Sequence, residues 1–257
     1  MNISRINIFG ILISKINLRE ATLFLSQYNY ANTNYICLPD LYVLTAAQKD
    51  KILAYILNHS LLTLPDGKSI EFIGRIKGEK NFTSVSGYWL VKELLKSNLK
   101  HYFYGGILKT NGILADKLKN EFPSSIIVGI SSPPLVNLDQ IESNSAIVKD
   151  FEIINQLKPD IIWVGISSPK QDYLVYHYYK LLDHGILIAV GGVFDYLSGS
   201  KKISPEWVKT IGFRWLYRLA QEPKRLWRKY LFAFLRFATL ILKELFNRYI
   251  KGSNRIN

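Results

Sequence analysis

Short apolar runs and stretches of helical spacing alternate along most of the chain. Apolar runs predict a strand or hairpin over residues 3–13 and shorter strands at 35–38, 61–64, 101–104, 125–130, 161–164 and 186–190. Apolar positions three and four residues apart predict helices at 18–28, 41–58, 89–97, 113–121, 145–156 and 172–182. Strands that alternate with helices form a parallel sheet with right-handed crossovers. We therefore expect an α/β fold, a Rossmann-like parallel sheet flanked by helices.

The pattern changes near residue 200. A helix is predicted from Pro205 to Ala220, because proline suits the first turn of a helix. Pro223 then interrupts the chain, and a last helix is predicted over 225–250, with one apolar stripe at positions 226, 230, 234, 237 and 241. We expect two parts, a core of residues 1–200 and a basic amphipathic helical appendage of residues 201–257.

Positive charge is concentrated in this appendage. The whole chain carries a net charge of +13, and between residues 214 and 257 eleven Lys or Arg stand against Glu222 and Glu244, a net charge of +9. Aromatic and aliphatic residues alternate with these cations, which is typical of a helix that lies on anionic lipid. A solvated basic helix is the plain alternative. Nucleic acid is not an expected partner, because a recognisable reader fold usually accompanies such charge.

Neither membrane insertion nor disulfide bonding is expected. The apolar stretch 230–242 is interrupted by Arg236 and is shorter than the roughly 20 residues that span a bilayer. The first 14 residues lack the long apolar run of a signal peptide, so no leader is expected. Cys37 is the only cysteine, which excludes a disulfide framework and a cysteine metal cluster.

Polar residues follow several predicted strands, at the edge of the sheet where such folds bind ligands. Asp66 comes after the strand at 61–64, and its carboxylate can take the proton of an attacking hydroxyl. An Asp-Gly turn is the structural alternative for this position. Asp195 follows the strand at 186–190, where it either binds substrate or caps a helix.

Three further positions suit a substrate that contains phosphate and sugar. Gly105-Gly106, between a strand and a helix, either let backbone amides approach a phosphate or form a close turn. Gln171 can hydrogen-bond sugar hydroxyls with both halves of its amide. Lys170 beside it offsets phosphate charge or is simply exposed.

No metal or cofactor is expected. The four histidines, His59, His101, His177 and His184, lack metal-ligand spacing, and no Asp-x-Asp stands at a strand end. A nucleotide diphosphate then needs cationic side chains, and arginine matches phosphate geometry best. The candidates recur at spacings of four, seven and three, so that they can line one face: Arg214, Arg218, Arg225 and Arg228.

The chain resembles the WecG/TagA/CpsF family of bacterial glycosyltransferases from beginning to end. The strongest match is a long basic and aromatic string at 212–219 and 222–230. Four shorter motifs follow the family's order: Pro65-Asp66-Gly67, Tyr104-Gly105-Gly106, Pro169-Lys170-Gln171 and Gly192-Val193-Phe194-Asp195.

The resemblance implies a metal-independent, inverting transfer from a UDP-sugar to an undecaprenyl-diphosphate-linked sugar, without a cofactor. Members serve common antigen, teichoic acid, capsule and exopolysaccharide assembly, and use N-acetylmannosamine, glucose or other sugars. By resemblance Asp66 is the base, and Gln171 and Asp195 bind substrate. The appendage from about Ile211 is implied to dock peripherally on the anionic, cytoplasmic face of the inner membrane and to close over the site.

The chain departs from the family pattern at three places. Leu38-Pro39-Asp40 stands where Thr-x-Asn is common, which makes Asp40 a candidate for substrate binding. Ser84 replaces an arginine, and Ile203-Ser204-Pro205 replaces Arg-Ala-Pro. These changes bear on the donor sugar. They also support one alternative function, a non-catalytic membrane-associated scaffold of the same fold, against which the intact motifs argue. A homo-oligomer is left open.

Overall fold

A six-stranded parallel sheet forms the centre of the molecule. The computed structural model describes residues 3–205, 207–208 and 212–253, with side chains described as far as residue 243. The strand order is β4-β3-β8-β7-β5-β6, and every adjacent pair is parallel. The strands are β3 (Asn34–Cys37), β4 (Leu62–Thr63), β5 (Lys100–Gly105), β6 (Ile126–Ser131), β7 (Ile161–Gly165) and β8 (Ile186–Ala189). A separate antiparallel hairpin pairs β1 (Arg5–Ile8) with β2 (Ile11–Ser14).

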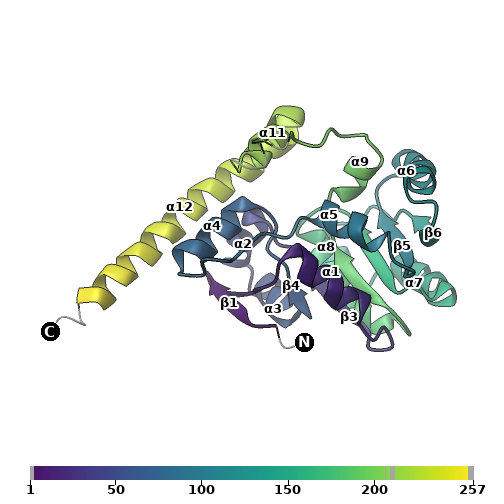
Figure 1. Cartoon of the computed structure of the whole chain (residues 1–257), viewed down its shortest axis with the longest axis horizontal. Coiled ribbons are helices and arrows are strands. Elements are labelled where there is room, and N and C mark those ends of the chain that lie inside the picture. Colours follow the sequence, from purple (N-terminus) through teal and green to yellow (C-terminus); the bar gives the residue numbers. More distant parts are fainter. Residues whose placement is uncertain (1–2, 206, 209–211, 254–257) are drawn as a thin grey trace.

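Helices cover both faces of this sheet (Figure 1). One hydrophobic core joins the sheet to α2 (Leu41–Ala47), α3 (Lys51–His59), α4 (Lys68–Ile76), α7 (Ser145–Leu157) and α8 (Lys170–Tyr178). The other joins it to α1 (Leu18–Ser26), α5 (Gly87–Leu94), α6 (Leu108–Glu121) and α9 (Val193–Leu197). Short 3-10 turns lie at Leu138–Gln140 and Tyr179–Leu181. Successive strand residues feed opposite cores, as Phe103 and Tyr104 of β5 do, because side chains alternate across a strand.

The C-terminal part consists of α11 (Arg214–Gln221) and α12 (Pro223–Ser253), which runs along one side of the core (Figure 1). Lys229 of α12 lies 4.1 Å from the ring centroid of Tyr42 in α2. Phe237 packs edge to face on Phe9 of the hairpin turn, with ring centroids 6.4 Å apart. Within the described part of the chain, no helix combines the length and the apolar character needed to cross a bilayer.

The predicted α/β fold with a helical C-terminal appendage is confirmed, and two helix predictions are wrong in detail. The predicted helix at 41–58 is divided, because Asp50 caps α3 by accepting a hydrogen bond from the Leu53 amide at 3.0 Å. The predicted helix from Pro205 to Ala220 is interrupted at Gly212, whose φ of 84° is outside the helical region, and α11 begins only at Arg214. Residues 206 and 209–211 of that range lie outside the described residues.

The order of the strands places a switch point between β3 and β8, at whose carboxyl ends such sheets usually bind ligands. The chain leaves β3 for its neighbour β4 on one side, and reaches β8 from β7 on the other. At such a switch point the connecting loops turn away from each other, which leaves room for a ligand. Asp40 follows β3, and Gly191 and Gly192 follow β8, so these residues lie at the switch point.

Candidate active site

A cavity of about 340 Å³ lies where the loops after β3 and β4 meet α11 and α12. The charged residues of its lining are Asp40, Asp66, Lys68, Arg214 and Arg218. Its apolar wall comes largely from the appendage, through Phe213, Trp215, Tyr230, Ala233, Phe234 and Phe237. The cavity is therefore amphiphilic, with charge on the core side and around α11, and rings along α12.

Asp66 reaches this cavity because the chain turns sharply after β4. Its amide donates a hydrogen bond to the Pro39 carbonyl at 3.0 Å, and Gly67 adopts a φ of 92° before α4 begins. Burial raises the pKa of the Asp66 carboxyl above its ordinary value, while Arg214 and Arg218 act in the opposite direction. A carboxylate that binds a proton more readily than usual suits a general base.

Asp40 has a structural role at the same edge of the sheet. It caps α2 by accepting a hydrogen bond from the Val43 amide at 2.9 Å. Its charge also raises the pKa of Asp66, less strongly than burial does. Contact of Asp40 with substrate stays a prediction.

Arg214 and Arg218 lie one turn apart on α11 and both line the cavity. The Arg218 guanidinium lies 5.9 Å from the centroid of the Tyr196 ring, and its Nε is buried without a hydrogen-bond partner among the described residues. Burial works against the charge of Arg218, but Tyr196, Tyr230 and the two cavity aspartates outweigh it and raise its pKa. A cation held charged with an unused donor is prepared to bind an anion.

The first turn of α8 contributes two buried polar side chains, Gln171 and Asp172. Gln171 is buried, and its Oε1 has no hydrogen-bond partner within the described chain. A Cβ added at Gly191 would lie 3.5 Å from that oxygen, so the amide faces the loop after β8. Lys170 points elsewhere, since its Nζ donates to the Val136 carbonyl at 2.8 Å. Sugar binding by Gln171 and an offset of phosphate charge by Lys170 stay predictions.

Asp172, beside Gln171, was not found from the sequence. Its side chain is fully buried, and neither carboxylate oxygen has a hydrogen-bond partner among the described residues. Burial raises the pKa of Asp172 to about 7; the Cys37 side chain and, more weakly, Lys229 lower it. An acidic residue in the first turn of a helix is ordinary, so the sequence carries no signal that this one is buried.

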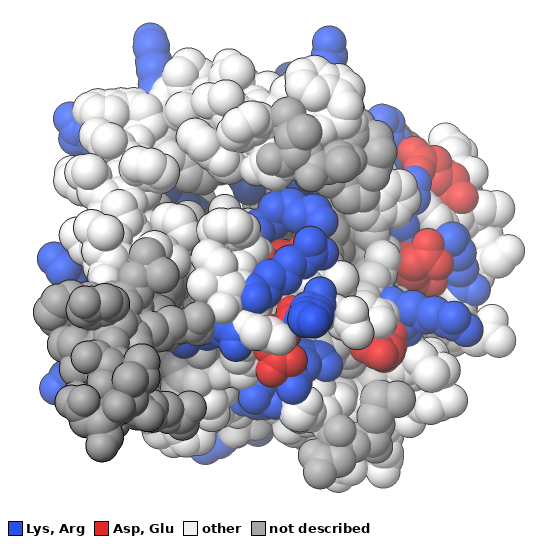
Figure 2. Space-filling model, turned by 60° about the vertical axis from the view of Figure 1, so that its left-hand side comes forward, with Lys and Arg blue, Asp and Glu red and all other residues white. Residues whose placement is uncertain are grey.

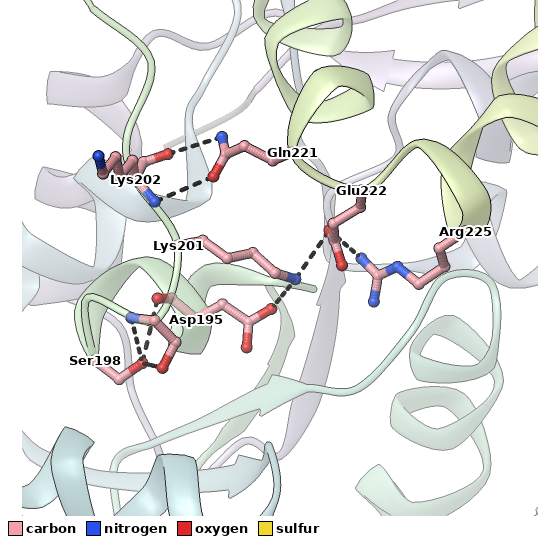
Figure 3. A network of polar contacts seen from close by, with 8 residues as sticks. Asp195, Ser198, Lys201, Lys202, Gln221, Glu222 and Arg225 are labelled. Atoms are coloured by element: carbon pink, nitrogen blue, oxygen red, sulfur yellow. Dashed lines mark hydrogen bonds and ion pairs between the residues drawn. The ribbon is translucent and has the colours of Figure 1, made fainter.

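Asp195 is engaged in a chain of ion pairs that reaches the appendage (Figure 3). Its carboxylate pairs with Lys201, whose Nζ also lies 3.0 Å from Glu222 Oε2. Arg225 pairs with the same Glu222 oxygen at 2.7 Å. Gln221 and Lys202 add a reciprocal pair of hydrogen bonds at 3.2 Å. Sequence reasoning missed Lys201, which links a candidate substrate residue to the junction between α11 and α12.

The remaining predicted residues are not part of the cavity lining. Arg225 and Arg228 are exposed near the start of α12, and Arg228 lies 5.2 Å from the centroid of the Trp227 ring. The Gly106 amide donates to the Gly165 carbonyl at 3.0 Å, and a Cβ at Gly105 would lie 2.4 Å from that carbonyl oxygen. These glycines therefore form a close turn from β5 toward α6 that packs against the end of β7, and phosphate binding there stays a prediction.

Among the described residues, no group of three or more His, Cys, Asp or Glu side chains is arranged to hold a metal ion. The cavity instead gathers a carboxylate with a raised pKa, two arginines of α11 and an apolar wall.

Comparison with known families matches residues 6–251 to the glycosyl transferase WecG/TagA/CpsF family. The chain belongs to this family. It is therefore a glycosyltransferase, and the resemblance seen in its motifs is confirmed. An N-acetylglucosaminyldiphosphoundecaprenol N-acetyl-beta-D-mannosaminyltransferase of Bacillus subtilis (strain 168) is 28% identical over 207 residues, which cover 79% of this chain and 77% of that protein. A protein of the same name from Bacillus spizizenii (strain ATCC 23059 / NRRL B-14472 / W23) is 26% identical over 193 residues, covering 74% and 71%.

Proposed function

We propose that this WecG/TagA/CpsF glycosyltransferase moves a sugar from a UDP-sugar to an undecaprenyl-diphosphate-linked sugar during assembly of a cell-surface polysaccharide. The observation that carries the proposal is the amphiphilic cavity, in which Asp66 lies with Arg214 and Arg218 beside an apolar wall. The names of the two Bacillus relatives support a lipid-linked acceptor and an N-acetylmannosamine-type donor sugar. A glucose-type donor is the second candidate.

The proposed chemistry is a single displacement with inversion. Asp66 accepts the proton of the acceptor hydroxyl as its oxygen attacks the anomeric carbon. The bond from that carbon to the donor phosphate breaks, and the electron pair leaves with the nucleotide diphosphate. Arg214 and Arg218 stabilise the charge that develops on this leaving group. We propose that no metal ion is needed, since these two cations line the cavity beside the base.

The appendage is proposed to bring the enzyme to the lipid. Phe213, Phe234 and Phe237 give the cavity an apolar wall that suits a prenyl chain, and α12 exposes further large apolar side chains such as Phe232 and Leu235. Together with the basic residues of this segment, they suit peripheral docking on an anionic membrane, proposed to be the cytoplasmic face of the inner membrane. The division near residue 200 is part of this proposal.

The donor sugar is proposed to lie toward the loop after β8. Gln171 faces Gly191, and Asp195 and Arg218 flank Gly192, where a Cβ would lie 3.8 Å from Asp195 Oδ2 and 3.4 Å from Arg218 Nη2. A sugar there would find amide, carboxylate and guanidinium groups as hydrogen-bond partners.

The test is a transfer assay with a panel of UDP-sugars and a short-chain prenyl-diphosphate N-acetylglucosamine acceptor, with products identified by mass. A product one sugar heavier, formed with stoichiometric release of UDP in the presence of EDTA, is expected. Absence of UDP release with every donor would instead favour the non-catalytic scaffold. A requirement for added divalent metal would overturn the metal-independent mechanism alone.

A further inference from the structure

A lysine lies at the cavity wall close after the proposed base in the sequence. Lys68 is the first residue of α4, two positions beyond Asp66, and lines the cavity together with Arg214 and Arg218. A Cβ added at Gly212 would lie 3.4 Å from the Cβ of Lys68, so this side chain lies against the loop that leads into α11. Core and appendage therefore meet at Lys68.

A buried carboxylate holds the Lys68 ammonium in place. Nζ of Lys68 lies 2.8 and 3.0 Å from the two oxygens of Glu71, whose side chain is 4% exposed. The amide and hydroxyl of Ser84 each donate to Glu71 Oε2 at 3.0 Å. Burial alone would raise the pKa of Glu71, but Lys68 and Ser84 outweigh it and lower the pKa, so this carboxylate stays charged.

The single Glu71 carboxylate pairs with two cations, so the cluster as a whole keeps a net positive charge. Arg75 Nη2 donates to Glu71 Oε1 at 2.7 Å, so one carboxylate faces both Lys68 and Arg75. An ammonium has three N–H donors, and two Glu71 oxygens do not exhaust them. The Lys68 side chain is 40% exposed, on the cavity side of the cluster. Figure 2 shows Lys and Arg side chains gathered near the middle of one face, with Asp and Glu among them.

The charged residues that line the cavity give it a net positive charge, which an anionic substrate would balance. Among the described residues of its lining, three cations face two carboxylates, and one of these, Asp66, becomes neutral when it takes up a proton. A diphosphate brings about two negative charges, and fixed cations with free donors are the groups that recognise it.

We propose that Lys68, held by Glu71, binds the diphosphate group of a substrate as a third cation beside Arg214 and Arg218. The inference rests on the proposed function and deepens it. Both substrates of that reaction contain a diphosphate, one in the nucleotide donor and one between the acceptor sugar and its lipid. Glu71 acts through Lys68 and is a positioning residue.

Binding of inorganic pyrophosphate and of UDP, measured by calorimetry on the full chain, tests the proposal without turnover. Lys68→Met should raise the pyrophosphate Kd about tenfold or more, as expected for loss of a charge-assisted hydrogen bond. The matched control is Arg75→Met, which removes the same charge from the same carboxylate at a residue outside the cavity lining. Equal weakening in both variants would make the cluster purely structural and overturn the proposal.

The position of Glu71 is tested by a double-mutant cycle. Glu71→Gln should also weaken pyrophosphate binding, and the Lys68→Met, Glu71→Gln double variant should bind no worse than Lys68→Met alone. Additive losses would show that Glu71 acts independently of Lys68 and would overturn its positioning role. Melting temperatures of all variants identify any that lose binding by unfolding.

Two further arms separate the sources of the diphosphate. A raised UDP Kd in Lys68→Met assigns Lys68 to the donor, whereas an unchanged UDP Kd with a raised KM for the lipid-linked acceptor assigns it to the acceptor. If all of these constants match wild type, the proposal is wrong. If wild type binds pyrophosphate through Lys68 but transfers no sugar, the proposed function fails and the diphosphate site stands.

Discussion

The two helices of the appendage carry similar cations in different surroundings. Arg214 and Arg218 of α11 line the cavity, and Arg218 is partly buried with an unused donor. Arg225 and Arg228, a few residues later in α12, are exposed and pair with Glu222 or lie against Trp227. Charge alone does not define this site. A cation becomes part of it only where the backbone carries it to the carboxyl edge of the sheet.

The largest effect is expected where the α11 cations meet the proposed base. Asp66→Asn removes the proton acceptor and should lower kcat by about a hundredfold or more. Donor binding should change little, because the variant keeps the shape of the side chain. Steady-state kinetics with a soluble acceptor analogue and calorimetry with UDP measure the two effects. Turnover near that of wild type would leave Asp66 as a turn residue.

The comparison between the helices is tested by substitution of one arginine from each. Arg218→Ala should lower kcat by about tenfold to a hundredfold through loss of a charge-assisted contact, whereas Arg228→Ala should change it less than threefold. The two variants lose the same charge, so net charge cannot explain a difference. Similar losses in both would contradict the division between cavity and surface arginines.

The variants Arg218→Ala and Arg228→Ala also give a prediction about the pH dependence of activity. Arg218 lowers the pKa of Asp66, so its removal raises that pKa further, and the base is then protonated over a wider acid range. The acid limb of the kcat/KM profile should move to higher pH in Arg218→Ala and stay in place in Arg228→Ala. An unshifted limb in both would mean that Asp66 does not control it.

A smaller effect on turnover and a larger one on lipid binding are expected from the outer face of α12. Phe232→Glu combined with Leu235→Glu places charge among exposed apolar side chains and should weaken binding to anionic vesicles about tenfold or more, as sedimentation would measure. Thr239→Glu adds charge at another exposed position without loss of apolar surface and is the control. Turnover on a soluble acceptor should persist in all three proteins. Unchanged vesicle binding in the double variant would remove this face from the docking surface.

The smallest effect on activity is expected at Asp172, where α12 influences the core and the change appears in stability instead. The pKa of Asp172 is raised to about 7, so the folded state favours its protonated form. Its contribution is complete at low pH and is lost as pH rises from about 4 toward 7. Asp172→Asn cannot ionise, so its free energy of unfolding relative to wild type should rise by about 3 kcal/mol between pH 5 and pH 8, which melting temperatures at the two pH values would detect. A difference that does not vary with pH would show that Asp172 is ionised throughout.

Sequence reasoning located the sheet and the place of Asp66 at its edge for local reasons. Strands β5, β7 and β8 are short apolar runs bounded by glycine, and Asp66 follows such a run directly, so its place at the sheet edge follows from the α/β pattern. Of the four candidate arginines, Arg214 and Arg218 line the cavity, and Arg225 and Arg228 do not. The sequence predicts a break at Pro223, and Glu222, with φ of −135° and ψ of 57°, separates α11 from α12 and resets the helical phase between the two pairs of arginines.

The missed residues depend on contacts between distant segments. Lys68 gains its setting from Glu71 and from Ser84, which lies 13 residues beyond Glu71. Lys201 joins Asp195 to Glu222 across the loop that precedes α11. The contacts of Ser84 with Glu71 and of Lys201 with Glu222 leave no periodic signal in the chain, because each joins segments that are separate in the sequence.

The divided wall of the cavity has a thermodynamic consequence. One side belongs to the loops after β3 and β4, and the other to α11 and α12, so a substrate that fills the cavity contacts both. If the docked appendage strengthens substrate binding, then bound substrate stabilises docking of the appendage by the same free energy, because the two equilibria belong to one thermodynamic cycle. A lipid surface that orders α12 would thereby raise affinity for substrates it never touches. Conversely, a saturated enzyme would leave the membrane more slowly than an empty one.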